Sequence, residues 1–456
     1  MSKRSINKSV DELQAAMAAQ DPAAIAAAVT ALEPDETAHA VSHLSELDQS
    51  RLLKALPRKN AAQLVHDLPA AQAVQSMGWL SADEVAGIVS ELPSNEQADV
   101  IGILPDFEAS AILDAMPPSE AREARRLLAY PADAAGGLMI TEYLAYHDDL
   151  SVGDVLDDLR TNAERYRQYD VQYAYVVADG GKLVGVLRLR DLVLSSHRDQ
   201  ISTVMITKPL HVRDTTSLEV LERFFDRHKL FGVPALDANG LLVGVVRSHD
   251  VEQAVEERSS RSFLKFMGIV GGEELRTMPL RTRSLRRLGW LTVNIGLNIV
   301  AASVIAFHQD TLQAVIALAV FLPIISDMSG CSGNQAVAVS MRELSLALVR
   351  PSEIGWVLGR EVAVGLINGI ALGILLGVVG WLWQGNIILG VVVAAALAVN
   401  TLLAVCIGGT IPLVLRGFGQ DPALASGPIL TTVTDMSGFF LVLTFAGAVL
   451  PWLTNT

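Results

Sequence analysis

Two carboxylates lie inside stretches of the chain that are otherwise apolar enough to cross a lipid bilayer. Each belongs to the same tetrapeptide, Asp-Met-Ser-Gly, which occurs at residues 327–330 and again at 435–438. A carboxylate at the centre of a membrane-spanning helix costs about 2.5–3.5 kcal/mol on insertion scales, so such a residue normally faces water or a partner. We therefore predict that Asp327 and Asp435 line one pathway for a cation.

The side chains around both copies offer oxygen ligands. Hard cations such as Mg2+ and Ca2+ prefer oxygen, whereas softer metals prefer imidazole or thiolate. Because Mg2+ gives up its bound water reluctantly, a site with few carboxylates and many carbonyls suits the hydrated ion. Besides the two carboxylates, the candidate pore residues are Gly330, Asn334, Gln335 and Thr431.

Pro323 precedes the first copy, and we expect it to break the helix that carries Asp327. Irregular backbone at membrane depth persists only where it is buried in protein or lines a wet cavity, so the freed carbonyls would join the cation site. The glycines and serines nearby have a second explanation that stays open, because small residues also let helices pack closely.

Five apolar runs are each near the roughly 20 residues that a membrane span needs. The arginines in the connections between these runs would all lie on one side of the membrane. By the positive-inside rule that side is cytoplasmic, which places the amino terminus in the cytoplasm and the carboxyl terminus outside. The second and fifth spans then run in opposite directions. Asn294 and Asn400 precede the two carboxylates by 33 and 35 residues, a spacing that indicates a weak inverted repeat, and inverted repeats often hold an ion site at mid-depth. The expected spans are 288–307, 312–341, 360–383, 387–415 and 426–453.

The 280 residues before the spans are acidic, with 42 Asp and Glu against 27 Lys and Arg. This charge argues against nucleic acid as a partner and favours cation binding or simple solvation. The two cysteines have neither the pattern of a disulfide framework nor zinc-ligand spacing. No nucleophile–base pair or phosphate-binding loop indicates an enzyme, and the first residues lack the apolar core of a signal peptide.

A 12-residue repeat runs from about residue 23 to 117. An apolar residue followed by Pro or Ser recurs at every twelfth position, and apolar pairs precede most of these residues by three and four positions. That spacing makes one face of a short helix, which the Pro ends. Stacked short helices form an α-solenoid, a regulatory or interaction module. The recurring residues are Leu44, Leu56, Leu68, Leu80, Leu92, Leu104 and Met116.

A second repeat follows, in which LMITEYL at 138–144 recurs as VMITKPL at 204–210. Hairpin turns at 179–181 and 239–240 separate apolar strands, so each copy is expected to fold as strand–helix–strand–strand–helix. This order resembles a tandem pair of CBS domains, which usually sense small ligands. CBS domains that bind adenine nucleotides usually have Ser or Thr three residues before an Asp. The corresponding residues here are Arg188 and Arg247, which argues against ATP as a ligand.

Together these features resemble the MgtE family of magnesium channels over residues 20–456. The resemblance implies a homodimer in the plasma membrane, with a pore lined by the second and fifth spans. It makes Asp435 the ion-selecting carboxylate and Asn334 the polar residue of the second span. It also implies a plug helix after the CBS pair and closure by cytosolic Mg2+, with Glu219, Asp250 and Asp421 as regulatory carboxylates. The segments that carry it are the helical repeat, the CBS pair, YPADAAGGLM, PIISDMSGCSGNQ and DPALASGPILTTVTDMSG.

Two departures from the family pattern affect these expectations. The second span reads Ser329-Gly330-Cys331 where Gly-Gly-Asn is usual, so selectivity is expected to shift slightly. The plug helix reads ERSSRS at 257–262 where an acidic run is usual, so Arg258 and Arg261 replace carboxylates. Closure by Mg2+ is therefore expected at higher concentration than in relatives with the full acidic run.

The expected fold is a multidomain membrane protein with a cytosolic α-solenoid, tandem α/β CBS domains, a connecting plug helix and a five-helix transmembrane domain. The expected function is a Mg2+-selective uptake channel, since a potential of 100 mV draws a divalent ion with about 4.6 kcal/mol. Its partners would be a second copy, membrane lipid and Mg2+. A coupled transporter or exchanger of divalent cations is the alternative, and a membrane-anchored sensor is a third reading. The expected segments are an N-terminal tail at 1–22, the helical-repeat domain at 23–130, the CBS domains at 131–199 and 200–254, the plug helix at 255–280 and the transmembrane domain at 281–456.

Overall fold

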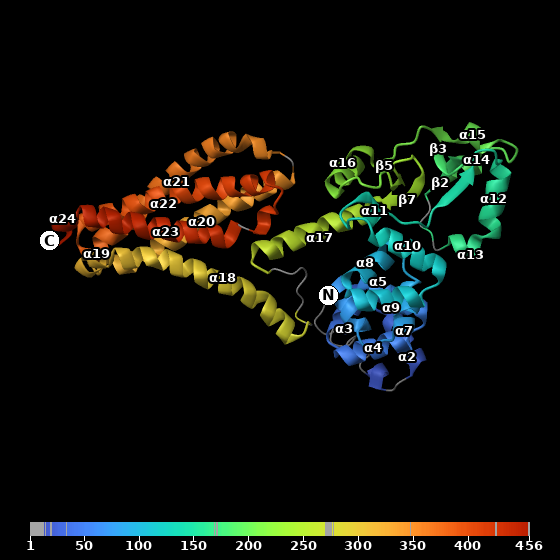
Figure 1. Ribbon diagram of the computed structural model, residues 1–456, viewed down its shortest axis with the longest axis horizontal. Coiled ribbons are helices and arrows are strands. Elements are labelled where there is room, and N and C mark those ends of the chain that lie inside the picture. Colours follow the sequence, from blue (N-terminus) through green and yellow to red (C-terminus); the bar gives the residue numbers. More distant parts are fainter. Residues whose placement is uncertain are drawn as a thin grey trace. The chain divides into compact units, whose positions relative to one another are not determined.

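The structure is a computed structural model with two compact units, Met1–Ser259 with Leu275–Met278 and Ser260–Glu274 with Pro279–Thr456. The first unit holds the short helices and two small sheets, and the second holds the long helices (Figure 1). It describes residues 13, 15–18, 21–32, 34–167, 169, 172–269, 276, 278–346, 348–424 and 426–454.

The helical repeat follows the 12-residue period of the sequence. From α4 onward, successive helices begin 12 residues apart, and the residue before each is the predicted Ser or Pro. Ser45 and Ser81 accept hydrogen bonds from backbone amides of the first helical turn, which is how a serine caps a helix. The period is confirmed in α2 (Pro22–Thr30), α3 (Pro34–Ser42), α4 (Glu46–Ala55), α5 (Arg58–Asp67), α6 (Ala70–Met77), α7 (Ala82–Val89), α8 (Ser94–Ile103), α9 (Asp106–Ala115) and α10 (Pro118–Leu128).

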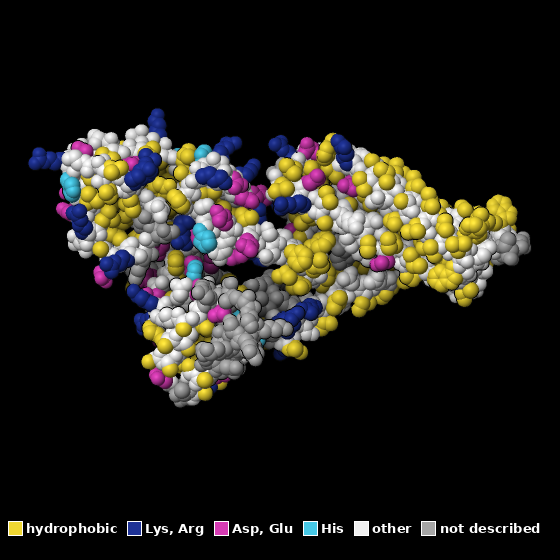
Figure 2. All heavy atoms as spheres, turned by 180° about the vertical axis from the view of Figure 1, so that it is seen from behind, with side chains coloured by type: hydrophobic (Ala, Val, Ile, Leu, Met, Phe, Trp, Pro, Cys, Tyr) yellow, Lys and Arg dark blue, Asp and Glu magenta, His cyan; other side chains and the backbone are white. Residues whose placement is uncertain are grey.

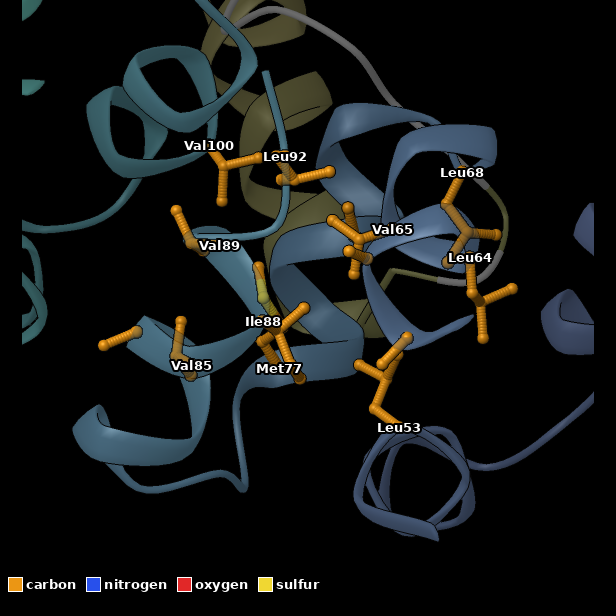
Figure 3. Packing of buried hydrophobic residues seen from close by; sticks show 14 of the residues in the cluster. Leu53, Leu64, Val65, Leu68, Met77, Val85, Ile88, Val89, Leu92 and Val100 are labelled. Carbon is orange, nitrogen blue, oxygen red and sulfur yellow. The ribbon is translucent and has the colours of Figure 1, made fainter. Parts of the chain in front are cut away.

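The apolar pairs of this repeat form one continuous core. Leu64 and Val65 of α5 and Ile88 and Val89 of α7 are all buried in this core, and in the view of Figure 3 Val65 lies between Leu64 and the two residues of α7. Each helix packs on the second helix along the chain, as α4 does on α6 and α7 on α9. Burial of each such side chain contributes about 1.5–3 kcal/mol, so no helix of the repeat is stable without its neighbours.

Each half of the second repeat forms strand, helix, strand, strand and helix, as predicted. In the first half β1 pairs in parallel with β2, which pairs antiparallel with β3, and the second half repeats this arrangement. The elements are α11 (Ala135–Leu138), β1 (Leu144–His147), α12 (Val152–Thr161), α13 (Ala163–Tyr166), β2 (Tyr173–Ala178), β3 (Lys182–Arg188), α14 (Leu189–Leu194), α15 (Ile201–Val204), β4 (Ile206–Thr207), β5 (Val212–Arg213), α16 (Leu218–His228), β6 (Gly232–Leu236), β7 (Leu242–Arg247) and α17 (Ser248–Phe266).

The two halves exchange their first segments. β4 belongs to the second copy in sequence but pairs with β3 of the first, and Ile140 of the first copy bridges Val245 of β7 in the second. The crossing segments lie so close to the sheets that a β-carbon at Gly185 would overlap the sulfur of Met205. The two halves are therefore interlocked by backbone hydrogen bonds.

The second unit consists of long apolar helices, which run side by side in Figure 1 and present mostly hydrophobic side chains in Figure 2. They are α18 (Leu280–Phe307), α19 (Gln309–Ala314), α20 (Leu318–Ser345), α21 (Ile354–Gln384), α22 (Ile387–Gly417), α23 (Ser426–Ala448) and α24 (Leu450–Thr454). Among the described residues, four helices are long and apolar enough to cross a membrane, namely Leu280–Phe307, Pro351–Gln384, Ile387–Gly417 and Ile429–Ala448. The second expected span, α20, is 28 residues long but carries the polar run 326–335.

Two expectations about helix continuity were wrong. Pro323 lies inside α20 and does not break it, because proline removes only one hydrogen bond near the start of the helix. The chain breaks earlier, between α19 and α20. The connecting helix was expected to reach about residue 280, but α17 ends at Phe266, and Gly268 follows with a φ of +81°. A glycine in that conformation is a common helix terminator.

Candidate functional site

A polar stripe runs along one face of α20. Asp327, Cys331 and Asn334 are four and three residues apart, a spacing that aligns side chains on one side of a helix. Asp327, Cys331 and Gln335 are exposed, and Asn334 is half-buried. The opposite side buries Phe321 and Ile325 in the core of this unit. The stripe therefore points out of the apolar core that the single chain provides.

α23 presents a matching polar face. Thr431 and Asp435 lie one turn apart, with Thr431 exposed and Asp435 half-buried. Ser326 of α20 donates a hydrogen bond from its hydroxyl to the Asp435 carboxylate. A β-carbon placed at Gly330 would lie 3.7 Å from Thr434 Oγ1. The two tetrapeptides, 108 residues apart in sequence, are thus brought together where α20 crosses α23.

Four of the predicted pore residues therefore lie near the contact of α20 and α23. Gly330 is buried at the helix contact, and Asp435, Thr431 and Asp327 lie at or beside it. Asn334 and Gln335 lie two helical turns after Asp327 on α20. Because α20 is a continuous helix, its carbonyls are engaged in helical hydrogen bonds, so the expected set of freed carbonyls was wrong.

Two residues beside the contact of α20 and α23 were not predicted from the sequence as site residues. Ser326, which donates to Asp435, directly precedes the tetrapeptide and could have been noticed as a hydroxyl at the edge of the motif. Asn400 was noted only for its spacing, yet its Nδ2 donates to the carbonyl of Thr434 over 3.0 Å. A fully buried asparagine inside a 31-residue apolar helix is the signal that could have identified it.

The predicted regulatory carboxylate Asp421 is paired with a cation of the chain itself. Lys265 Nζ, just before the end of α17, lies 2.7 Å from Asp421 Oδ2, and the amide of Ala423 donates to Oδ1. Burial works to raise the pKa of Asp421, but these hydrogen bonds outweigh it and hold the pKa below its ordinary value. Asp421 is therefore ionised at neutral pH and already neutralised by an ammonium group.

The other two regulatory candidates are paired in the same way. Arg258 of α17 lies 3.5 Å from Glu219 and 3.7 Å from Glu222, both on α16. Arg247 donates two hydrogen bonds of 2.7 Å to the two oxygens of Asp250. Burial raises the pKa of Asp250, with Arg247 acting in the opposite direction. All three predicted regulatory carboxylates thus contact a basic side chain.

The two residues that argued against ATP have structural partners. Arg188 Nε lies 2.7 Å from Asp191, three residues along the chain, in the same arrangement as Arg247 with Asp250. In each CBS copy the arginine therefore pairs with the aspartate three residues after it. Among the described residues, no group of three or more His, Cys, Asp or Glu side chains is arranged to hold a metal ion.

Comparison with known families covers most of the chain. Residues 322–445 match the MgtE family, described as a divalent cation transporter. Residues 32–133 match the MgtE intracellular N domain, and 135–198 and 201–257 each match the CBS domain. Along the chain, the matches therefore follow one another as the N domain, the two CBS domains and the transporter domain.

Individual relatives agree with these matches. The chain is 31% identical over 332 residues to the magnesium transporter MgtE of Bacillus subtilis (strain 168), covering 72% of each protein. It is 33% identical over 327 residues to the magnesium transporter MgtE of Thermus thermophilus, covering 71% of this chain and 72% of that relative. The crystal structure of the soluble part of a magnesium transporter shares the fold over 56% of this chain and 99% of its own, with a TM-score of 0.50 and 20% identity. The two relatives are named as transporters and not as enzymes.

Proposed function

Since this chain belongs to the MgtE family of divalent cation transporters, we propose that it is a Mg2+-selective channel with Asp435 as its ion-selecting carboxylate. The observation that carries the proposal is the hydrogen bond between Ser326 and Asp435, which joins the polar faces of α20 and α23 inside an apolar helical unit. The relatives are named as magnesium transporters, and the oxygen-rich character of these faces suits that ion.

The polar faces explain why a second copy is needed. Asp327, Cys331 and Gln335 are exposed on α20, and polar side chains exposed to lipid are costly. A homodimer that apposes two such faces would shield them from lipid and enclose a wet path. The membrane potential then supplies the driving force for a divalent cation entering the cytoplasm.

The continuous helix α20 determines how the ion would be held. Its backbone carbonyls are used within the helix, so the direct partners of the ion would be side chains and water. Asp435, Asn334 and Thr431 would receive hydrogen bonds from the hydration shell, with Asp435 supplying the charge. This arrangement suits Mg2+, which keeps its water more firmly than Ca2+ does.

The proposal extends to topology and regulation. α20, the second span in chain order, would complete the set of five spans, the amino terminus would be cytoplasmic and the carboxyl terminus outside, and α17 would act as the plug. Cytosolic Mg2+ would close the pore by binding at Asp421, Glu219 and Asp250. It would have to compete there with Lys265, Arg258 and Arg247, which already neutralise these carboxylates. The matching arginines of the CBS copies favour the absence of ATP binding.

Replacement of Asp435 by Asn tests the pore assignment. The charge is lost with little change of shape, so Mg2+ influx into proteoliposomes under an inside-negative potential is expected to be abolished. Asp310→Asn in α19, which lies outside the predicted pore faces, is the control and should retain wild-type influx. Wild-type influx through Asp435→Asn at equal protein content would refute the assignment. Unitary currents in planar bilayers would identify a channel, and their absence despite flux would favour an exchanger.

A further inference from the structure

Three helices meet at a buried polar junction directly behind Asp435. Ser329 of α20 and Asn400 and Thr401 of α22 are each 0% exposed, and Thr434 of α23 is 1% exposed. The helices approach closely at this level, because a β-carbon at Gly333 would lie 3.0 Å from the carbonyl of Ala404. Buried polar groups inside an apolar unit are costly unless they are used, so each of these side chains requires an explanation.

Asn400 makes a specific contact at this junction. Its Nδ2 donates to the carbonyl of Thr434, the residue immediately before Asp435. A carbonyl oxygen can accept two hydrogen bonds, so Asn400 adds a second donor to a carbonyl within helix α23. A β-carbon at Gly438 would lie 2.8 Å from the same nitrogen, so the glycine leaves the space through which Asn400 reaches the helix.

We propose that Asn400 is a positioning residue for ion selection, which fixes the turn of α23 that carries Asp435. This inference rests on the proposed role of Asp435. Ser326 holds the carboxylate itself from α20, and Asn400 holds the backbone one residue earlier from α22. The carboxylate is therefore oriented by two helices that do not carry it, which keeps its distance to a hydrated ion nearly constant.

The remaining polar atoms indicate that the amide donor is the part of Asn400 that matters. In the part of the chain that the structure describes, Asn400 Oδ1 and Thr401 Oγ1 have no hydrogen-bond partner. An asparagine retained for a general polar network would use both ends of its amide. Asn400 uses only Nδ2, and that atom contacts the backbone of the helix that bears the selecting carboxylate.

The test compares Asn400→Ala with Thr401→Val, a matched control that removes a buried, unpartnered hydroxyl from the next residue of the same helix. Both full-length variants are reconstituted, and Mg2+ influx is measured against Mg2+ concentration and against Ca2+ influx. Asn400→Ala is expected to raise the half-saturating Mg2+ concentration about fivefold, the effect of losing one buried hydrogen bond. It should also lower the ratio of Mg2+ flux to Ca2+ flux. Thr401→Val should change neither.

A second route to the same contact covers the case in which Asn400→Ala does not fold. Gly438→Ala inserts a methyl group against Asn400 Nδ2 and should lower the flux ratio in the wild-type background. Where Asn400→Ala does fold, adding Gly438→Ala to it should lower the ratio less than in the wild-type background, because only the contact with Ile325, at 3.3 Å, remains. Unchanged ratios and half-saturation in both single variants would overturn the inference. If Asp435→Asn still abolishes influx, the proposed pore survives; if it does not, both proposals fail together.

Discussion

Breaking the ion pair between Lys265 and Asp421 should loosen the closed state of the proposed channel. Lys265 belongs to the last turn of α17, and Asp421 lies between α22 and α23, on the segment that leads into the pore helix. If α17 is the plug, this pair fastens the plug to the pore-bearing unit. Lys265→Met keeps the length and apolar stem of the side chain and removes only its charge.

The size of the effect follows from the geometry. The nitrogen and oxygen are 2.7 Å apart, and the two side chains are 35% and 30% exposed. A fully exposed pair contributes about 0.2–1 kcal/mol, and breaking a buried one costs about 3–5 kcal/mol. For this intermediate exposure we expect about 1–2 kcal/mol, which corresponds to a change of about 5–30-fold in the ratio of open to closed channels.

Single-channel recording in Mg2+-free solution on the cytosolic side measures this ratio directly. Lys265→Met should raise the open probability, and the exchange Lys265→Asp with Asp421→Lys should restore it. Lys54→Met is the matched control, because Lys54 forms an ion pair of 2.6 Å with Glu84 in the helical repeat, far from α17 in sequence. An open probability that stays at the wild-type value in Lys265→Met would refute the fastening role of this pair.

Two further predictions concern the first unit. Gly185→Ala should destabilise the CBS pair by about 1–3 kcal/mol, since its methyl group would overlap Met205 on the exchanged segment; thermal unfolding checks this against Gly289→Ala, whose methyl group would meet no atom within 4 Å. The pKa of His66 is raised by its hydrogen bond to Glu96 and by the charge of Asp67, against the opposing effects of burial and Arg247. The protonated imidazole therefore stabilises the folded protein fully below about pH 6.5, and this stabilisation is lost as the pH rises. His66→Gln should remove this dependence from melting curves between pH 6 and 8, and a dependence that persists would contradict the assignment.

Features that depend on local periodicity were accessible from the sequence. The 12-residue spacing located every helix start from α4 to α10, because a Pro or Ser cap is a property of a few adjacent residues. The hairpin turns located β2, β3, β6 and β7 for the same reason. The exchange of first segments between the CBS copies was not accessible, because Met205 and Gly185 meet only through the tertiary fold.

The candidate site shows the same division. The tetrapeptides identified Asp327 and Asp435, since a carboxylate in an apolar run is conspicuous in one dimension. The contacts that hold Asp435 in place come from Ser326 of α20 and Asn400 of α22. These two residues precede Asp435 by 109 and 35 residues in the sequence. Pro323 misled the prediction because the cost of a proline depends on its position in the helix, and the start of α20 could not be placed within a few residues.

The basic residues of α17 also limit how Mg2+ can regulate the channel. Two of the three predicted regulatory carboxylates are neutralised from this helix, by Arg258 and Lys265, and the third by Arg247. A cation attached to the same chain acts at an effective concentration in about the millimolar range or above. Free Mg2+ must exceed that competition before it can replace Arg258 at Glu219 or Arg247 at Asp250. Closure of the wild-type channel is therefore expected only at millimolar cytosolic Mg2+, and closure below that range in patch recordings would show that the carboxylates are not held by these cations.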